Sequence, residues 1–349
     1  MTAPPEADAG LVETVLRRYY LEDATKLDIG RELGISRFKV ARLLDEAKRR
    51  GLVRIEIMPG AADLELSESL RRALGLRRAL VVSRSVGTDA ESIRRSVGRL
   101  GAQLVSEVAG MESVVGFASS RSMLALAEEI ETLHDCTVVQ LNGVPSHQMT
   151  GNGPVELVRT IAAKSTGHSR VFYAPFVLPS AQSARDVRRD PMVRWAMSAY
   201  ARLSVAVVTV GAWSAGASAL WESASERERD DVAAKGGVGE VCGILVDAAG
   251  QYVRTPIASR VIAIGQRELE RVPEVIAVVD AENRVDAIRA VAAGKRITSL
   301  VTSDPIARAL IRGAAPVSDP DPTTGSRRDG DPGNTRRDSS VLPHVHANA

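Results

Sequence analysis

The loop Gly116-Phe-Ala-Ser-Ser-Arg-Ser122 places three hydroxyl groups and a guanidinium directly before a predicted helix. A helix N-terminus carries unpaired backbone N–H groups and a partial positive charge, so it attracts anions. Ser119, Ser120, Arg121 and Ser122 therefore form a candidate cradle for a phosphate or a carboxylate. Serine-rich turns also serve simply to cap helices, and that alternative stays open.

Further polar residues lie at or beyond the ends of apolar runs that we interpret as strands. In an open parallel sheet, ligands bind outside the carboxyl ends of the strands, where the connecting loops gather. We expect the residues at these ends to lie near the serine loop, and Gln140 and Asn142 to meet the hydroxyl groups of a small ligand. The residues that follow the predicted strands include Asn142, Gly143, Asp280 and Asp304.

A second kind of chemistry is carried by residues 25–51, TKLDIGRELGISRFKVARLLDEAKRRG, where basic side chains gather on a predicted helix. An arginine on the early, exposed face of such a helix can bind guanine O6 and N7 with two hydrogen bonds. Basic residues at the end of the helix reach phosphates. The early face carries Arg37, Phe38, Lys39, Ala41 and Arg42, and the helix end carries Lys48, Arg49 and Arg50.

The spacing within this segment predicts a helix-turn-helix that presents the basic helix to a major groove. Gly34 supplies the positive φ of a tight turn, Ser36 is a suitable N-cap, and Gly30 is small enough for a close helix crossing. The buried seam recurs at helical spacing. It consists of Ile29, Leu33, Val40, Leu43, Leu44 and Ala47.

The flanking residues complete a winged-helix domain over residues 11–58. Apolar residues at helical spacing from Leu11 to Tyr20 predict a first helix that closes a three-helix core. Residues 51–57 alternate apolar and charged side chains, which predicts a short strand suited to a wing. Residues 1–10 are expected to be disordered.

From residue 62 to 312, short apolar runs alternate with amphipathic segments, which predicts a mainly parallel, Rossmann-like α/β sheet with helices on both faces. A hairpin of residues 243–247 with 251–253 is expected within it. The predicted strands are 79–82, 113–116, 137–141, 205–210, 276–279 and 299–302, and the predicted helices are 64–74, 93–108, 122–130 and 155–163.

Composition bounds the class of protein. The 349 residues are 44% hydrophobic and carry a net charge of +2, so DNA affinity must come from a local patch. Residues 11–57 hold eleven Lys or Arg against eight Asp or Glu, a modest excess that favours several copies acting together. Two distant cysteines and scattered histidines predict reduced thiols, no metal site and no cofactor.

The ends of the chain and its apolar runs indicate its location. No apolar run is long enough to cross a bilayer, and the N-terminus lacks a signal pattern. We therefore expect a cytoplasmic protein with no membrane partner. Residues 313–349 are rich in Pro, Asp, Gly, Ser and Arg, which predicts a disordered tail.

With these residues in view, the chain resembles the SorC/DeoR-type sugar-responsive transcriptional regulators over residues 11 to 312. In the N-terminal part the resemblance rests on Tyr19-Tyr20, Leu33-Gly-Ile-Ser-Arg37, Val40-Ala-Arg-Leu-Leu44, Ala47-Lys-Arg-Arg-Gly-Leu-Val53 and Ile55-Glu-Ile57. In the C-terminal part it rests on Val138-Val-Gln-Leu-Asn-Gly143, Ala174-Pro175, Gly239-Glu-Val-Cys-Gly243, Asp247 with Gly250, Ala287-Ile288 and Leu300-Val-Thr-Ser-Asp304.

The resemblance implies a DNA-binding domain followed by a sugar-binding domain similar to sugar-phosphate isomerases. It matches the loop 116–122 to the family's phosphate loop, with Ser122 where Thr is usual and Ser119-Ser120 in place of Trp-Gly. Glu240 matches a carboxylate that accepts sugar hydroxyls. Arg284 falls where Lys is usual, and an arginine cannot form a Schiff base, so an ionic contact is implied instead.

The resemblance also bears on the DNA-binding half, where Lys26 replaces a more usual Gln and Gly30 replaces Ala. The implied DNA-contacting set is Lys26, Ser36, Arg37, Phe38, Lys39, Arg42 and Arg49. The implied effector-binding set is Ser119, Ser120, Arg121, Ser122, Gln140, Asn142, Gly143, Glu240, Arg284 and Asp304.

We therefore expect a non-enzymatic transcriptional regulator of a carbohydrate-related operon. A sugar or sugar phosphate would modulate its binding to a double-stranded DNA operator, and the protein would act as a homo-oligomer, a dimer or a tetramer. We favour a phosphate on the helix at Ser122, with a neutral polyol as the alternative. Two other functions stay open: a sugar-phosphate isomerase or lyase with a DNA-binding appendage, using Glu240 and Asp304, and a regulator whose second domain only oligomerises.

Overall fold

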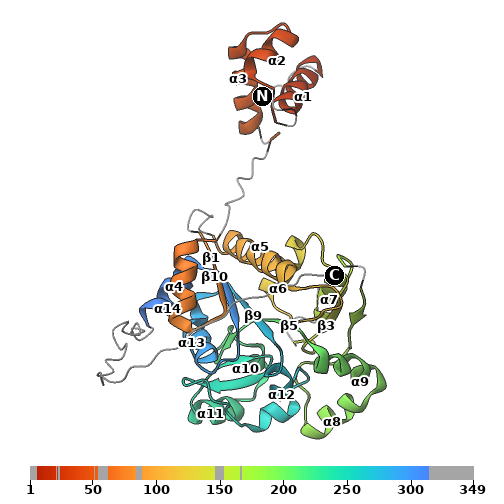
Figure 1. The fold of residues 1–349 in the computed structure, drawn as a ribbon, viewed down its shortest axis with the longest axis vertical. Coiled ribbons are helices and arrows are strands. Elements are labelled where there is room, and N and C mark those ends of the chain that lie inside the picture. Colours follow the sequence, from red (N-terminus) through yellow and green to blue (C-terminus); the bar gives the residue numbers. More distant parts are fainter. Residues whose placement is uncertain are drawn as a thin grey trace, which may run out of the picture.

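The computed structural model describes residues 6–313 except 21, 23, 51, 54–61, 84–88, 146–152 and 166. The expected wing strand at 51–57 and the expected tail at 313–349 lie almost wholly outside these residues. The described chain contains a three-helix N-terminal unit and an α/β domain, which confirms the predicted fold class (Figure 1). Each is described by itself below.

The N-terminal unit consists of α1 (Glu6–Tyr20), α2 (Lys26–Glu32) and α3 (Arg37–Arg49). Its core is formed by fully buried Val15, Ile29 and Val40 with the nearly buried Leu44. Because α1 begins at Glu6, residues 6–10 are helical rather than disordered as expected. Acidic residues and alanine are favourable in a first helical turn, which explains this difference.

A seven-stranded parallel sheet, in the order β1-β10-β9-β5-β2-β3-β4, forms the centre of the α/β domain. Chain order reverses between β2 and β5, because β2 leads outward to β3 while β5 leads to β9 on the other side. Such a switch point opens a crevice at the carboxyl ends of the strands. The strands are β1 (Arg78–Val82), β2 (Val114–Phe117), β3 (Thr137–Gln140), β4 (Ser169–Arg170), β5 (Val205–Val208), β9 (Glu274–Val279) and β10 (Ser299–Ser303).

Helices cover both faces of this sheet, as its continuous apolar strands require. Neighbouring residues of β5 point to opposite faces: Val207 packs in one hydrophobic cluster and Val208 in the other. One face is covered by α5 (Ala90–Val108), α6 (Arg121–Glu129) and α7 (Pro154–Ala162). The other is covered by α4 (Leu64–Leu74), α13 (Val285–Ala293) and α14 (Asp304–Arg312).

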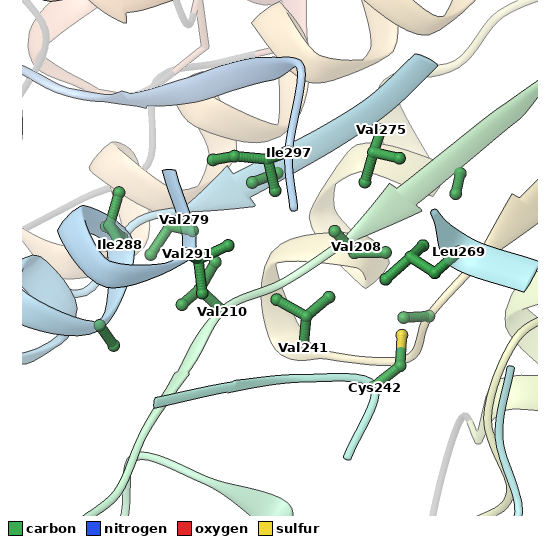
Figure 2. Packing of buried hydrophobic residues seen from close by; sticks show 14 of the residues in the cluster. Val208, Val210, Val241, Cys242, Leu269, Val275, Val279, Ile288, Val291 and Ile297 are labelled. Atoms are coloured by element: carbon green, nitrogen blue, oxygen red, sulfur yellow. The ribbon is translucent and has the colours of Figure 1, made fainter. Parts of the chain in front are cut away.

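A small antiparallel sheet of β6 (Gly211–Ala212), β7 (Gly237–Val241) and β8 (Ile244–Asp247) packs beyond the carboxyl end of β5. Figure 2 shows Val241 and Cys242 packed near Val208, Val210 and Leu269, so one core joins the two sheets. The remaining helices are α8 (Ala181–Arg189), α9 (Pro191–Met197), α10 (Ala219–Ser223), α11 (Glu226–Ala234) and α12 (Gln266–Leu269).

The hairpin expected in this region is only partly as predicted. Val246 does pair with Tyr252 in an isolated bridge, but β8 pairs mainly with β7 through a turn at Cys242 and Gly243. Both turn residues have positive φ, of 51° and 82°, as a two-residue hairpin turn requires. The β7 strand was missed because its two glycines and one glutamate are residue types depleted in strands.

Candidate functional site

The turn between α2 and α3 has the geometry that its sequence predicts. Gly34 adopts φ of 63°, and the Ser36 hydroxyl accepts a hydrogen bond of 3.2 Å from the Lys39 amide as the N-cap of α3. A β-carbon on Gly30 would lie 2.7 Å from the carbonyl oxygen of Ile35, so a larger residue here would force the neighbouring backbone to shift. The turn is therefore fixed by local chemistry, and it sets the direction of α3.

The exposed face of α3 carries the residues expected to contact DNA. Arg37, Lys39 and Arg42 are exposed, and the Phe38 side chain is 72% exposed with the Arg37 guanidinium 4.9 Å from its ring centre. Arg49 is exposed at the helix end and forms an ion pair of 2.7 Å with Glu46. This face is therefore basic, with one large apolar side chain in its middle.

The two other candidates for DNA contact have partners within the unit. The Lys26 ammonium lies 5.6 Å from the centre of the Tyr19 ring, and the oxygen of Ser36 is engaged as the α3 N-cap. Arg18 bridges Glu22 and Glu32, which ties the end of α1 to the end of α2 and raises the pKa of its guanidinium. Arg18, Lys26 and Ser36 thus contact other residues of the N-terminal unit, whereas α3 presents Arg37, Lys39 and Arg42 as exposed side chains.

A pocket of about 750 Å³ opens at the carboxyl ends of β2, β3 and β5, where the order of the strands reverses. This volume suits a small-molecule ligand. Six of the ten residues expected to bind an effector line it. They are Ser119, Ser120, Arg121, Asn142, Glu240 and Arg284.

The serine loop reaches the pocket because β2 ends at Phe117 and the chain turns at once into α6. Ser120 is the N-cap of α6, and its hydroxyl accepts the Met123 amide at 3.2 Å. The Asn142 side chain holds the same loop from the neighbouring strand end, since its Oδ1 accepts the Ser119 amide at 2.8 Å. Arg121 follows as the first residue of α6 and is exposed at the pocket.

Glu240 also lines the pocket and is almost fully buried. Its Oε1 accepts the Ser218 hydroxyl at 3.0 Å, and its Oε2 accepts the Gly243 amide at 2.7 Å. Burial raises the pKa of the Glu240 carboxyl, which these two hydrogen bonds and the nearby Arg284 partly oppose. A carboxylate fixed in this way can accept hydrogen bonds from ligand hydroxyls.

Arg284 lies just before α13, lines the same pocket and is half-buried. Its Nη1 donates to the Thr209 hydroxyl at 3.1 Å, while its buried Nε has no hydrogen-bond partner among the described residues. Burial lowers the pKa of its guanidinium, and the carboxylates of Asp280 and Glu240 act in the opposite direction. Arg284 is therefore a partly buried cation whose charged form is favoured by two carboxyl groups.

The four remaining effector candidates do not line this pocket. Ser122 is buried and donates to Asp280, and Asp304 is buried and paired with Arg308 at 2.9 Å. The side-chain amide of Gln140 donates to the Asn142 carbonyl oxygen and accepts the Phe172 backbone amide. Gly143 lies against the backbone of Pro175, because a β-carbon on Gly143 would lie 2.6 Å from the Pro175 carbonyl oxygen.

Several pocket residues were not anticipated from the sequence. Thr209 was counted inside a strand run, but β5 ends at Val208 and Thr209 is the first residue beyond it. Ser218 is the N-cap of α10, and Glu222 accepts the Gly216 amide at 2.6 Å. Phe176 and Cys242 also line the pocket; both lie in or beside motifs of the family resemblance, but neither was expected to contact a ligand.

The described residues include neither a helix long and apolar enough to cross a membrane nor a group of three or more His, Cys, Asp or Glu arranged to hold a metal ion.

A helix-turn-helix unit joined to an α/β domain with a pocket at its switch point defines a ligand-responsive regulator of transcription. Comparisons with known proteins support this class. Residues 59–312 match the family model described as "Putative sugar-binding domain". The chain is 30% identical to the transcriptional regulator LsrR of Klebsiella pneumoniae over 311 residues, which cover 87% of this chain and 94% of that protein.

Two further relatives agree with this result. The deoxyribonucleoside regulator of Bacillus subtilis is 28% identical over 298 residues, 84% of this chain and 95% of that protein. The crystal structure of the full-length sorbitol operon regulator SorC from Klebsiella pneumoniae has a TM-score of 0.74 at 26% identity, with 87% of this chain and 99% of that chain covered. The chain therefore belongs to the SorC/DeoR-type family of sugar-responsive transcriptional regulators, which confirms the resemblance found in the sequence.

Proposed function

We propose that this regulator binds an operator through α3 and that a small carbohydrate in the 750 Å³ pocket changes that binding. The observation that carries the proposal is the pocket itself, which is lined by a buried carboxyl group, a guanidinium and the serines at a helix N-terminus. Polyhydroxylated ligands both donate and accept hydrogen bonds, and this lining offers both kinds of partner. The names of the relatives, two of which refer to sorbitol and deoxyribonucleosides, agree with a carbohydrate ligand.

The same residues support a sensor rather than an enzyme. Isomerisation of a sugar phosphate needs a base with a suitable pKa placed against the substrate. The described lining residues include no Lys or His, and both oxygens of Glu240 already accept hydrogen bonds from Ser218 and Gly243. Asp304 does not line the pocket and is paired with Arg308. We therefore propose that the isomerase-like domain retains binding without catalysis. A regulator of transcription works where the chromosome lies, so we place it in the cytoplasm.

A thermal-unfolding screen distinguishes a ligand-sensing domain from a domain that only oligomerises. The full-length protein is screened by thermal unfolding against a panel of free and phosphorylated sugars and polyols. A specific ligand at a hundredfold excess over its dissociation constant stabilises the folded state by about 2.7 kcal/mol. Stabilisation by one or a few related compounds, lost on Thr209→Val, supports the sensor. If no compound of the panel shifts the transition, the domain only assembles copies of the chain.

A further inference from the structure

The N-terminus of α6 already has an anion beside it. Asp280 follows β9 directly, and its Oδ1 accepts the hydroxyl of Ser122, in the first turn of α6, at 2.7 Å. Negative charge is favoured near this end of a helix because the peptide dipoles point their positive ends there. The Asp280 carboxylate thus places a negative charge at the helix N-terminus, where the sequence predicts the phosphate of a ligand.

Asp280 is also held in place from its other side. Its Oδ2 accepts Arg94 Nε at 2.9 Å, and the two side chains are 11% and 20% exposed. Arg94 belongs to α5 and is paired in addition with Glu91 at 2.7 Å. Both oxygens of the Asp280 carboxylate are therefore engaged, so moving it aside for a phosphate would break two charge-assisted hydrogen bonds.

The charged residues that line the pocket are two arginines and two glutamic acids, Arg121 and Arg284 with Glu222 and Glu240. Asp280, which is paired with Arg94, also acts electrostatically on Arg284. A phosphate monoester would bring almost two more negative charges into this group at neutral pH. An uncharged sugar adds none, and its hydroxyls can donate to the carboxylates and accept from the guanidiniums.

We infer that Asp280 takes the place of a ligand phosphate at the N-terminus of α6, and that it makes this pocket selective for unphosphorylated sugars or polyols. The inference rests on the proposed function, since it names the class of carbohydrate that the same pocket accepts. It favours the neutral-polyol alternative over the phosphate expected from the sequence. Asp280 is thus a specificity-determining residue.

Inorganic phosphate is a direct probe of this inference, because it does not require that the natural ligand be known. Calorimetric titration of the full-length protein with phosphate should show no binding to the wild type up to millimolar concentration. Asp280→Asn keeps an oxygen to accept the Ser122 hydroxyl but removes the charge, and Asp280→Ala empties the position. Both variants should bind phosphate at least tenfold more tightly than the wild type. Glu91→Gln removes a different carboxylate from the same Arg94 and should bind no phosphate, like the wild type.

A second titration uses the sugar identified by thermal unfolding and its phosphate ester. The wild type should bind the free sugar at least tenfold more tightly than the ester, and Asp280→Asn should reduce or reverse this ratio. Tighter binding of phosphate or of the ester by the wild type would overturn the inference, as would folded Asp280 variants that gain no phosphate affinity. If no sugar binds any form of the protein, the proposed sensor function fails, while the phosphate titration still decides the role of Asp280.

Discussion

Gly30 and Ile35 approach each other so closely across the α2–α3 turn that a β-carbon on Gly30 would lie 2.7 Å from the Ile35 carbonyl oxygen. The Ile35 amide donates back to the Gly30 carbonyl at 2.9 Å, which closes the turn. Gly30→Ala should force these backbones apart at a cost of about 1–3 kcal/mol, the usual range for overpacking. Hydrogen exchange in α2 and α3 of the full chain should accelerate, and operator binding should weaken.

Gly10→Ala is the matched control, because nothing lies within 4 Å of a β-carbon at that position of α1. Alanine has a higher helix propensity than glycine, so this change should leave the stability of the N-terminal unit unaltered or raise it by up to about 1 kcal/mol. Equal effects of the two substitutions would contradict the tight turn.

The exposed arginines of α3 should differ in what they contact, some binding base edges and others the DNA phosphates. Arg37→Ala or Arg42→Ala should weaken operator binding by about 1–3 kcal/mol and relax the base preference, as expected for a lost contact to guanine. Arg49→Ala should weaken binding to all sequences alike and lower the salt dependence by about one unit of slope, as expected for a phosphate contact. Anisotropy titrations at several salt concentrations measure both effects.

Arg72→Ala serves as the control, since this arginine is equally exposed but lies in α4 and pairs with Glu68. It should leave DNA affinity unchanged. If the combined replacement of Arg37, Arg42 and Arg49 does not weaken operator binding, α3 is not the recognition helix.

The buried carboxyl of Glu240 should make stability depend on pH. Because burial raises its pKa in the folded state above the unfolded value, the folded protein binds this proton more tightly. Its contribution is fully present below the unfolded pKa and is lost as pH rises through the folded pKa. The free energy of unfolding of the wild type, measured relative to Glu240→Gln, should therefore fall as pH is raised. A difference that stays constant or grows with rising pH would exclude this role for Glu240.

Oligomeric assembly is expected because a single N-terminal unit offers only a small interface to DNA. One short helix contacts only a few base pairs, so tight and specific binding requires at least two N-terminal units on related half-sites. Light scattering of the full-length protein, free and on operator DNA, should give the mass of a dimer or a tetramer of the 37.2 kDa chain. A monomer in both states would contradict this prediction.

The fold was predictable where one local signal dominated. The seam of α2 and α3, Gly34 at the turn and the apolar parallel strands all follow from spacing and residue type, and most predicted bounds differ by only a few residues. The strand β7 was not predictable, because its glycines serve close packing: a β-carbon on Gly239 would lie 2.6 Å from that of Ala287. Such a requirement arises only from the tertiary contact.

The candidate site was predictable to the extent that strand ends define it. The loop after β2 and the residue Asn142 were found by this rule alone, whereas Glu240 and Arg284 required the family resemblance. The pairing of Ser122 with Asp280 could not be foreseen, since it joins residues 158 positions apart whose side chains meet only when β9 and α6 are in place. Both residues follow strands, but no sequence pattern shows which of them turns toward the other.

The central claim is that the pocket controls the binding of DNA. It is tested most directly by titrating the full-length protein against a selected operator, with and without the sugar that stabilises it most. The account predicts at least a fivefold change in Kd, the lower end of usual allosteric coupling, and loss of this change in Thr209→Val with DNA affinity otherwise retained. A sugar that binds in the pocket and leaves the operator Kd unchanged would contradict it.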